Sequence, residues 1–246
     1  MCGIAGFVDA SVPSEEREQA VLRMCAEMIH RGPDDSGMVT QGPATLGMRR
    51  LSIFDPVNGH QPMTTPDGRH TIVFNGAIYN FGPLRSELEA LGWSFRTHCD
   101  TEVLLAALSQ WGRHAIKRLR GMFAFALWDS SDESLLLARD PFGIKPLYFA
   151  READRLIFAS ETAALIASGA ASDEIDPGAV ADYLSWFAVP APRTIYSGIS
   201  SLLPGQCLKF ARGKFEVEET WSFRTIPAAT PCSTRQQFIG ELRERL

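Results

Sequence analysis

The chain has 246 residues, of which 45% are hydrophobic, so it can bury a full core as one large domain or as one domain with an appendage. It carries 24 lysines and arginines against 29 aspartates and glutamates, a formal charge of −5, and no basic run that would follow a phosphate backbone. Its longest apolar runs are far shorter than the roughly 20 residues that span a bilayer. We therefore expect a globular protein with no nucleic-acid partner and no membrane partner.

The cysteines and the N-terminus indicate the cellular compartment of the protein. The five cysteines are odd in number, widely spaced and free of CxxC pairs, which argues against a disulfide framework and against a zinc site. The five histidines show no paired spacing, so we assign no metal to this chain. The N-terminus lacks the basic and apolar segments of a secretory signal. Together these features favour the reducing cytoplasm.

The predicted elements are short and mix strands with helices. In chain order, strands are expected at residues 4–8, 47–53, 70–75, 121–128, 134–138, 155–159, 206–210 and 214–217. Helices are expected from residue 14 to the break at 31–33, and over 81–91, 100–111, 176–186 and 236–246. Asp100 and Asp176 stand where they could cap two of these helices. Successive hairpins separated by helices predict an α+β fold with antiparallel sheets.

The second residue is the strongest candidate for a catalytic group. Removal of Met1 would leave Cys2 with a free α-amino group, and an amine with a pKa of roughly 7.7–8.0 can accept the thiol proton near neutral pH. Nucleophile and base would then belong to one residue, without a distant histidine. The alternative is an ordinary start codon followed by a small buried residue, which position alone favours.

An amide hydrolase also needs oxyanion donors and groups that hold its substrate. Asn75 and Gly76, after a predicted strand, could offer a side-chain N–H and a backbone N–H to one oxygen, although Asn-Gly is also a common hairpin turn. Arg50 could clamp a carboxylate with its bidentate fork, or simply extend to solvent. Asp100 could bind an ammonium group, or serve only as a helix cap.

These fragments belong to a set of motifs in a fixed order. The motifs are MCGIAG at 1–6, HRGPD at 30–34, RLSI at 50–53, NGAIYN at 75–80, DTE at 100–102, GMFAFA at 121–126 and RDPFGIKPLY at 139–148. The set resembles the glutaminase half of bacterial asparagine synthetases of the glutamine-hydrolysing type, which are class II glutamine amidotransferases. The segment 182–204, with VPAPRT at 189–194, resembles the same enzymes. The resemblance covers the chain from Cys2 to about Trp221.

The resemblance implies a fold and a reaction. The fold would be that of the N-terminal-nucleophile hydrolases, a four-layer αββα sandwich of two antiparallel sheets. Cys2 would attack the side-chain carbonyl of L-glutamine and release ammonia from a γ-glutamyl thioester, which water would then hydrolyse to glutamate. The Cys2 α-amino group would carry the proton.

Site residues follow from the resemblance position by position. Asn75 and Gly76 match the oxyanion donors, Arg50 matches the group that holds the substrate α-carboxylate, and Asp100 matches the acceptor for its α-amino group. The pocket wall beside Arg50 would be formed by Leu51, Ser52 and Ile53. The family usually has glutamate where this chain has Ala77, so we expect a weaker affinity for glutamine or a shifted contact with unchanged thiol chemistry.

The resemblance also implies a division of the chain and a partner domain. Residues 2–221 would form the glutaminase domain, and residues 222–246 would contain a linker and the first helix of a synthetase domain that is otherwise missing. That C-terminal synthetase domain would bind ATP and magnesium and amidate aspartate to asparagine, whereas the glutaminase domain needs no cofactor. A homodimer is left open.

Two alternative functions are left open, and so are the roles of two motifs. The glutaminase could serve a synthetase-like enzyme with a different carboxylate acceptor, or the chain could be an inactive docking module with Ala77 as a sign of decay. Arg31 and the loop at 139–148 could act in function or only in tight turns.

Overall fold

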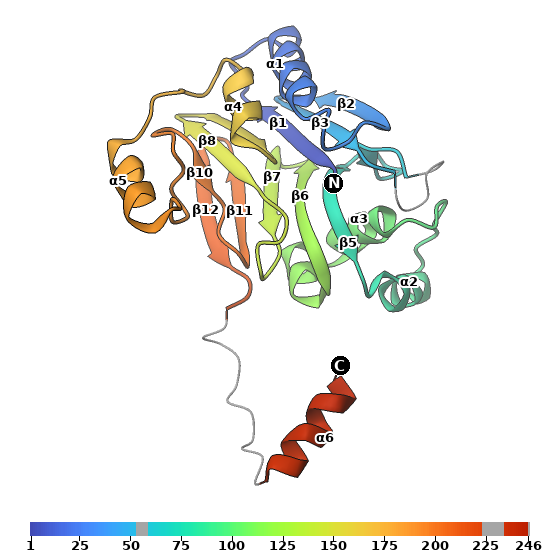
Figure 1. Ribbon diagram of the computed structural model, residues 1–246. Coiled ribbons are helices and arrows are strands. Elements are labelled where there is room, and N and C mark those ends of the chain that lie inside the picture. Colours follow the sequence, from blue (N-terminus) through green and yellow to red (C-terminus); the bar gives the residue numbers. More distant parts are fainter. Residues whose placement is uncertain (53–58, 223–233, 246) are drawn as a thin grey trace.

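The computed structural model describes residues 1–52, 59–222 and 234–245. Its strands form two six-stranded antiparallel sheets (Figure 1). The first sheet has the order β10-β8-β9-β1-β3-β2, with β10 Ser200–Ser201, β8 Tyr148–Glu152, β9 Arg155–Ala159, β1 Gly3–Val8, β3 Ala44–Arg50 and β2 Asp35–Gln41. The second has the order β12-β11-β7-β6-β5-β4, with β12 Lys214–Glu219, β11 Gln206–Ala211, β7 Ser134–Arg139, β6 Gly121–Asp129, β5 His70–Ile78 and β4 Met63–Thr64.

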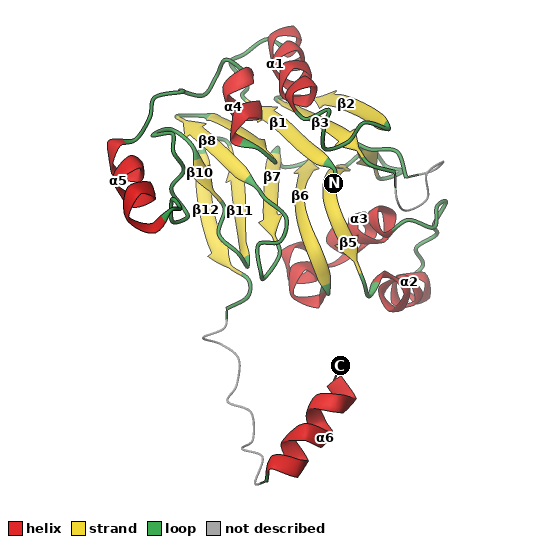
Figure 2. Cartoon of the chain, in the orientation of Figure 1, coloured by secondary structure: helices red, strands yellow, loops and turns green. Residues whose placement is uncertain are grey.

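Helices cover the outer faces of both sheets (Figure 2). The first sheet carries α1 Ser14–Glu27 and α4 Thr162–Ala167, whereas the second carries α2 Phe81–Ala90, α3 Asp100–Trp111 and the 3₁₀ helix η1 Gly112–Arg118. The remaining helices are α5 Pro177–Trp186 and α6 Arg235–Arg245. No helix among the described residues is long and apolar enough to cross a bilayer.

Three apolar clusters separate the four layers. One lies between the sheets and contains Trp128 and Phe158, and another packs α1 and α4 on the first sheet through residues such as Met24. The third packs α2, α3 and η1 on the second sheet through residues such as Leu104. In β1, Ile4 and Val8 face the inner cluster while Ala5 and Phe7 face α1, because successive side chains alternate across a strand. The predicted αββα sandwich is confirmed.

Most predicted elements are present, with differences at their ends. The helix at 14–30 ends at Glu27, and turns continue to Arg31. Asp176 caps α5 as predicted, since its Oδ1 accepts the N–H of Gly178 at 2.8 Å. The proposed cap at Asp100 is wrong in detail: Cys99 occupies the cap position, and Asp100 is the first helical residue. The proposed linker lies in the part of the chain that the structure does not describe.

The Asn75-Gly76 pair does not form a turn. Strand β5 continues through it to Ile78, with Asn75 opposite Ala124 and Gly76 opposite Phe123 on β6. The hairpin alternative is therefore wrong. The pair lies within β5, where it is paired with β6 in the second sheet.

Candidate active site

Strand β1 brings Cys2 to the edge of a cavity. Cys2 precedes the first strand residue, Gly3, and strand β3 lies beside it in antiparallel register. The residue after β3 is Leu51, whose backbone N–H donates to Cys2 Sγ at 3.4 Å, while the Leu51 carbonyl oxygen lies 3.7 Å from the same sulfur. The backbone of Leu51 thus holds the Cys2 sulfur in place at the end of β3.

The cavity has a volume of about 110 Å³ and gathers most of the residues singled out in the sequence. Cys2, Arg50, Leu51, Asn75, Gly76, Ala77 and Asp100 all line it. Ser52 does not line it, and its backbone N–H donates to Asp34 Oδ2 at 2.8 Å. Ile53 lies outside the described residues.

Asn75 and Gly76 are both tightly packed at the cavity, where Asn75 has a donor that is free among the described residues. Asn75 is 1% exposed, and within the described part of the chain its Nδ2 has no hydrogen-bond partner. A buried amide donor without an acceptor is costly and rare, so it marks a position where a ligand oxygen would bind. Gly76 cannot be replaced easily, because a Cβ there would lie 2.2 Å from the carbonyl oxygen of Met122.

Arg50 and Asp100 bring opposite charges to the same cavity. Each is 6% exposed, Arg50 at the end of β3 and Asp100 at the start of α3. Asp100 Oδ2 accepts the backbone N–H of Ile78 at 2.9 Å. Burial raises the pKa of the Asp100 carboxyl, while backbone N–H groups and the Arg50 charge act in the opposite direction. A buried cation and a buried anion on one wall suit the zwitterionic end of an amino acid.

Ala77 adds no charge to this wall. Its side chain is buried on β5 and lines the cavity with a methyl group. Among the described residues that line the cavity, Asp100 supplies the carboxylate. Asp100 is therefore the acidic side chain of this lining to which an ammonium group could bind.

Sequence reasoning missed Gln61, Thr101 and Lys145, which also line the cavity. Gln61 is buried, its Oε1 accepts the N–H of Phe74 at 2.7 Å, and its Nε2 donates to Thr101 Oγ1 at 3.2 Å. The glutamine side chain thereby ties β5 to α3 behind the cavity. Gln61 belongs to no motif, whereas Thr101 and Lys145 lie inside two of the quoted motifs.

The motif at 139–148 forms a loop held by its first two residues. Asp140 is fully buried, and its carboxylate accepts the N–H groups of Phe123, Phe142, Ile144 and Lys145 at 2.9–3.3 Å. The Arg139 guanidinium donates to the carbonyl oxygens of Gly143, Lys145 and Leu202 and to Ser201 Oγ. Arg139 and Asp140 therefore have a structural role in this loop.

Arg31 holds the chain at the nucleophile. Its Nε donates to the carbonyl oxygen of Cys2 at 3.0 Å, and its Nη1 pairs with Glu161 Oε1 at 2.8 Å. The next residue, Gly32, packs so closely that a Cβ would lie 2.3 Å from the backbone of Arg49. The Arg31 motif thus fixes the position of Cys2 relative to β3.

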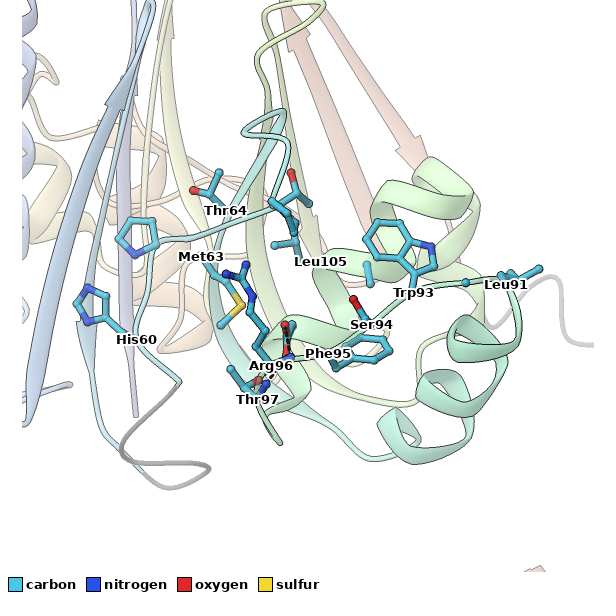
Figure 3. A pocket seen from close by; sticks show the side chains of 16 residues that line it. His60, Met63, Thr64, Leu91, Trp93, Ser94, Phe95, Arg96, Thr97 and Leu105 are labelled. Atoms are coloured by element: carbon cyan, nitrogen blue, oxygen red, sulfur yellow. Dashed lines mark hydrogen bonds between the residues drawn. The ribbon is translucent and has the colours of Figure 1, made fainter.

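Two larger cavities among the described residues are less suited to thiol chemistry. One, of about 690 Å³, is lined by Cys207 and His70, but burial raises the pKa of the Cys207 thiol to about 11. The other, of about 550 Å³, is lined by His60, Met63, Trp93, Phe95 and Arg96, among others, and contains no cysteine (Figure 3). No group of three or more histidine, cysteine, aspartate or glutamate residues in the described ranges is arranged to hold a metal ion. The thiol cavity at Cys2 is therefore the candidate active site.

Comparison with known proteins agrees with this geometry. Residues 1–221 match the family described as the glutamine amidotransferase domain. The chain belongs to this family. Asparagine synthetase [glutamine-hydrolyzing] 1 of Bacillus subtilis is 43% identical to the amidotransferase chain over 208 residues, and a putative asparagine synthetase [glutamine-hydrolyzing] of Mycobacterium bovis is 41% identical over 224 residues.

These matches cover most of this chain but only part of each relative. Each covers 83% of the amidotransferase chain but 33% and 34% of the two relatives, so the chain spans about a third of their length. The fold also matches the glutamine phosphoribosylpyrophosphate amidotransferase of B. subtilis, solved with ADP and GMP. That match has a TM-score of 0.64 and 19% identity, and it covers 89% of the amidotransferase chain and 49% of the solved chain.

Proposed function

We propose that the amidotransferase domain hydrolyses L-glutamine to glutamate and ammonia through a thioester on Cys2. One observation carries this proposal: Cys2 Sγ shares a cavity with the unpartnered Asn75 Nδ2 and with the oppositely charged pair Arg50 and Asp100. A nucleophile, an oxyanion donor and a zwitterion clamp are the parts that glutamine hydrolysis requires.

The reaction would proceed in two steps. The Cys2 thiol gives its proton to its own α-amino group, and Sγ forms a bond to the side-chain carbonyl carbon of glutamine. Asn75 Nδ2 and the Gly76 N–H donate to the resulting oxyanion, the C–N bond breaks, and the protonated amine passes its proton to the leaving nitrogen, which departs as ammonia. Water then attacks the thioester, and glutamate leaves as the thiol is restored.

Removal of Met1 is part of the proposal. Met1 is 55% exposed, and it also lines the cavity beside Cys2. Its removal would free the amine and widen the cavity for substrate at the same time. Cys25, Cys99 and Cys207 are free thiols as well, which suits the reducing cytoplasm that we propose for the enzyme.

The ammonia would serve the amidation of aspartate to asparagine. The names of the B. subtilis and M. bovis relatives support this acceptor, and those relatives are about three times as long as the matched region. The ATP- and magnesium-dependent step would take place in a synthetase domain corresponding to the remaining length of these relatives.

The test is glutamate release by protein whose N-terminus has been defined by mass spectrometry. Protein beginning at Cys2 should release glutamate and ammonia in equal amounts, and Cys2→Ala should abolish the release without changing the melting temperature by more than a few degrees. Cys25→Ala is the matched control. Equal turnover by Cys2→Ala and the unmodified enzyme would refute the proposal, and no turnover by either would indicate the inactive docking module.

A further inference from the structure

The loop at 139–148 fixes the backbone of Lys145 by hydrogen bonds. The backbone N–H of Lys145 donates to Asp140 Oδ2 at 2.9 Å, and its carbonyl oxygen accepts from Arg139 Nε at 2.8 Å. Both backbone groups of Lys145 are thus bound by buried or partly buried charged side chains of the same loop. This arrangement fixes the direction in which the Lys145 side chain leaves the loop.

The Lys145 side chain reaches the residue next to the nucleophile. Lys145 is 5% exposed and lines the cavity together with Cys2, and its Nζ lies 3.3 Å from Sδ of Met1, the residue bonded to Cys2. Within the described part of the chain, no carboxylate oxygen lies within 4 Å of Nζ. A buried ammonium without a close carboxylate is costly, so its position calls for an explanation.

The surrounding charges are consistent with a role at Cys2. Burial lowers the pKa of Lys145, the positive charge of Arg31 lowers it further, and the thiol of Cys2 and the carboxylate of Asp140 act in the opposite direction. Arg50 and Asp100 line the same cavity. The Lys145 ammonium therefore shares the cavity with the Cys2 sulfur, and the two groups are close enough for their charges to interact.

On the basis of the function proposed above, we propose that Lys145 is the cation that activates Cys2. Its ammonium stabilises the negative charge of the Cys2 thiolate as the thiol passes its proton to the Cys2 α-amino group. The thiol is then easier to deprotonate near neutral pH. The loop at 139–148, whose role the sequence left open, would then serve to position this cation.

The experiment measures the alkylation of Cys2 by iodoacetamide as a function of pH, with mass spectrometry to confirm that the chain starts at Cys2. In Lys145→Met the charge is lost and the length of the side chain is nearly kept. We expect the pKa of the thiol to rise by about 1, so that alkylation at pH 7 slows by about tenfold. The acidic limb of kcat/KM for glutamine should move to higher pH by a similar amount.

Three variants show whether charge is responsible. Lys145→Gln, a second neutral variant, should behave as Lys145→Met, and Lys145→Arg should return the alkylation profile toward that of the unmodified enzyme. Lys209→Met is the matched control, since it removes a lysine that pairs with Asp132 on the surface. It should leave the profile unchanged.

The alkylation assay needs no glutamine, so it separates this proposal from the proposed function. If the folded neutral variants alkylate with the same pH profile as the unmodified enzyme, or if Lys145→Arg behaves as they do, the assignment of Lys145 is wrong. If the profile shifts but no variant and no unmodified enzyme releases glutamate, the glutaminase proposal fails while the role of Lys145 stands.

Discussion

Asp100 Oδ2 accepts the backbone N–H of Ile78 at 2.9 Å, and this bond joins the first residue of α3 to the end of β5. The strand carries Asn75 and Gly76, and the helix carries the carboxylate. The hydrogen bond thereby sets the distance between the group that would bind the substrate ammonium and the groups that would bind the oxyanion. In the proposed mechanism, this one contact would couple substrate recognition to the chemical step.

Asn75→Ala should impair chemistry without impairing the fold. The variant removes one oxyanion donor, and a loss of about 10²–10³-fold in kcat is expected for such a donor. Because Asn75 Nδ2 has no partner among the described residues, no folded-state hydrogen bond from it is lost. Steady-state kinetics and thermal melting check both statements. Asn80→Ala, which removes a surface donor to the carbonyl oxygen of Arg118, is the control that should keep full activity.

Asp100→Asn should weaken glutamine binding. The amide can still accept the N–H of Ile78, but it leaves the substrate ammonium without its counter-charge, so kcat/KM should fall by about 10²-fold or more. Steady-state kinetics with glutamine give this value, with Asp132→Asn on the surface as the control. A KM within about twofold of the unmodified enzyme would show that another group binds the ammonium.

The same substitution gives a prediction about stability and pH. Burial raises the folded-state pKa of Asp100, so the folded state holds this proton more tightly than the unfolded state. The contribution of Asp100 to stability therefore decreases as pH rises through the interval between the two pKa values. Relative to Asp100→Asn, the unmodified protein should lose stability as the pH rises above the ordinary pKa of an aspartate, about 3.9. Urea unfolding at several pH values measures this difference, and a difference that grows in the opposite direction would contradict it.

Ala77→Glu should tighten glutamine binding. A glutamate here adds a second carboxylate to the cavity wall beside Asp100, so KM should fall several-fold with little change in kcat. Ala77→Gln is the matched control, because it adds the same volume without the charge. An unchanged KM in Ala77→Glu would remove support for the view that Ala77 lowers affinity.

The thiols should differ in reactivity. Burial raises the pKa of Cys25 to about 11 and that of Cys207 to about 11, so both are almost fully protonated at pH 8. Cys2 is partly exposed and receives the Leu51 N–H. In the folded protein, iodoacetamide at pH 8 should modify Cys2 well before Cys25 and Cys207, as peptide mass spectrometry would show. Modification of Cys25 first would contradict this order.

Secondary-structure elements could be predicted best where several local sequence signals agree. Strand β1 begins beside Cys2, and α5 begins with Asp176 and Pro177, because cap, proline and apolar spacing agree there. Strand β2 could not be predicted, since its residues Asp35–Gln41 show no alternation of apolar side chains. Helix α4 is too short, at six residues, for a helical period to appear.

The candidate site shows the same division. Cys2, Arg50, Asn75 and Asp100 could be found because each lies in a short motif with a chemical purpose. Gln61 could not, because its role comes from contacts with Phe74 and Thr101, which are 13 and 40 residues away in the chain. Asn75-Gly76 misleads in isolation, since pairing with β6 overrides the local preference of this dipeptide for a turn.

The most direct test of the central claim is to trap the covalent intermediate. Enzyme mixed with glutamine is quenched in acid, digested and analysed by mass spectrometry. We predict a peptide that starts at Cys2 and carries one γ-glutamyl group on sulfur, which hydroxylamine removes. A γ-glutamyl group on any other residue, or turnover by enzyme whose N-terminal peptide still begins with Met1, would contradict the assignment of Cys2 as an N-terminal nucleophile.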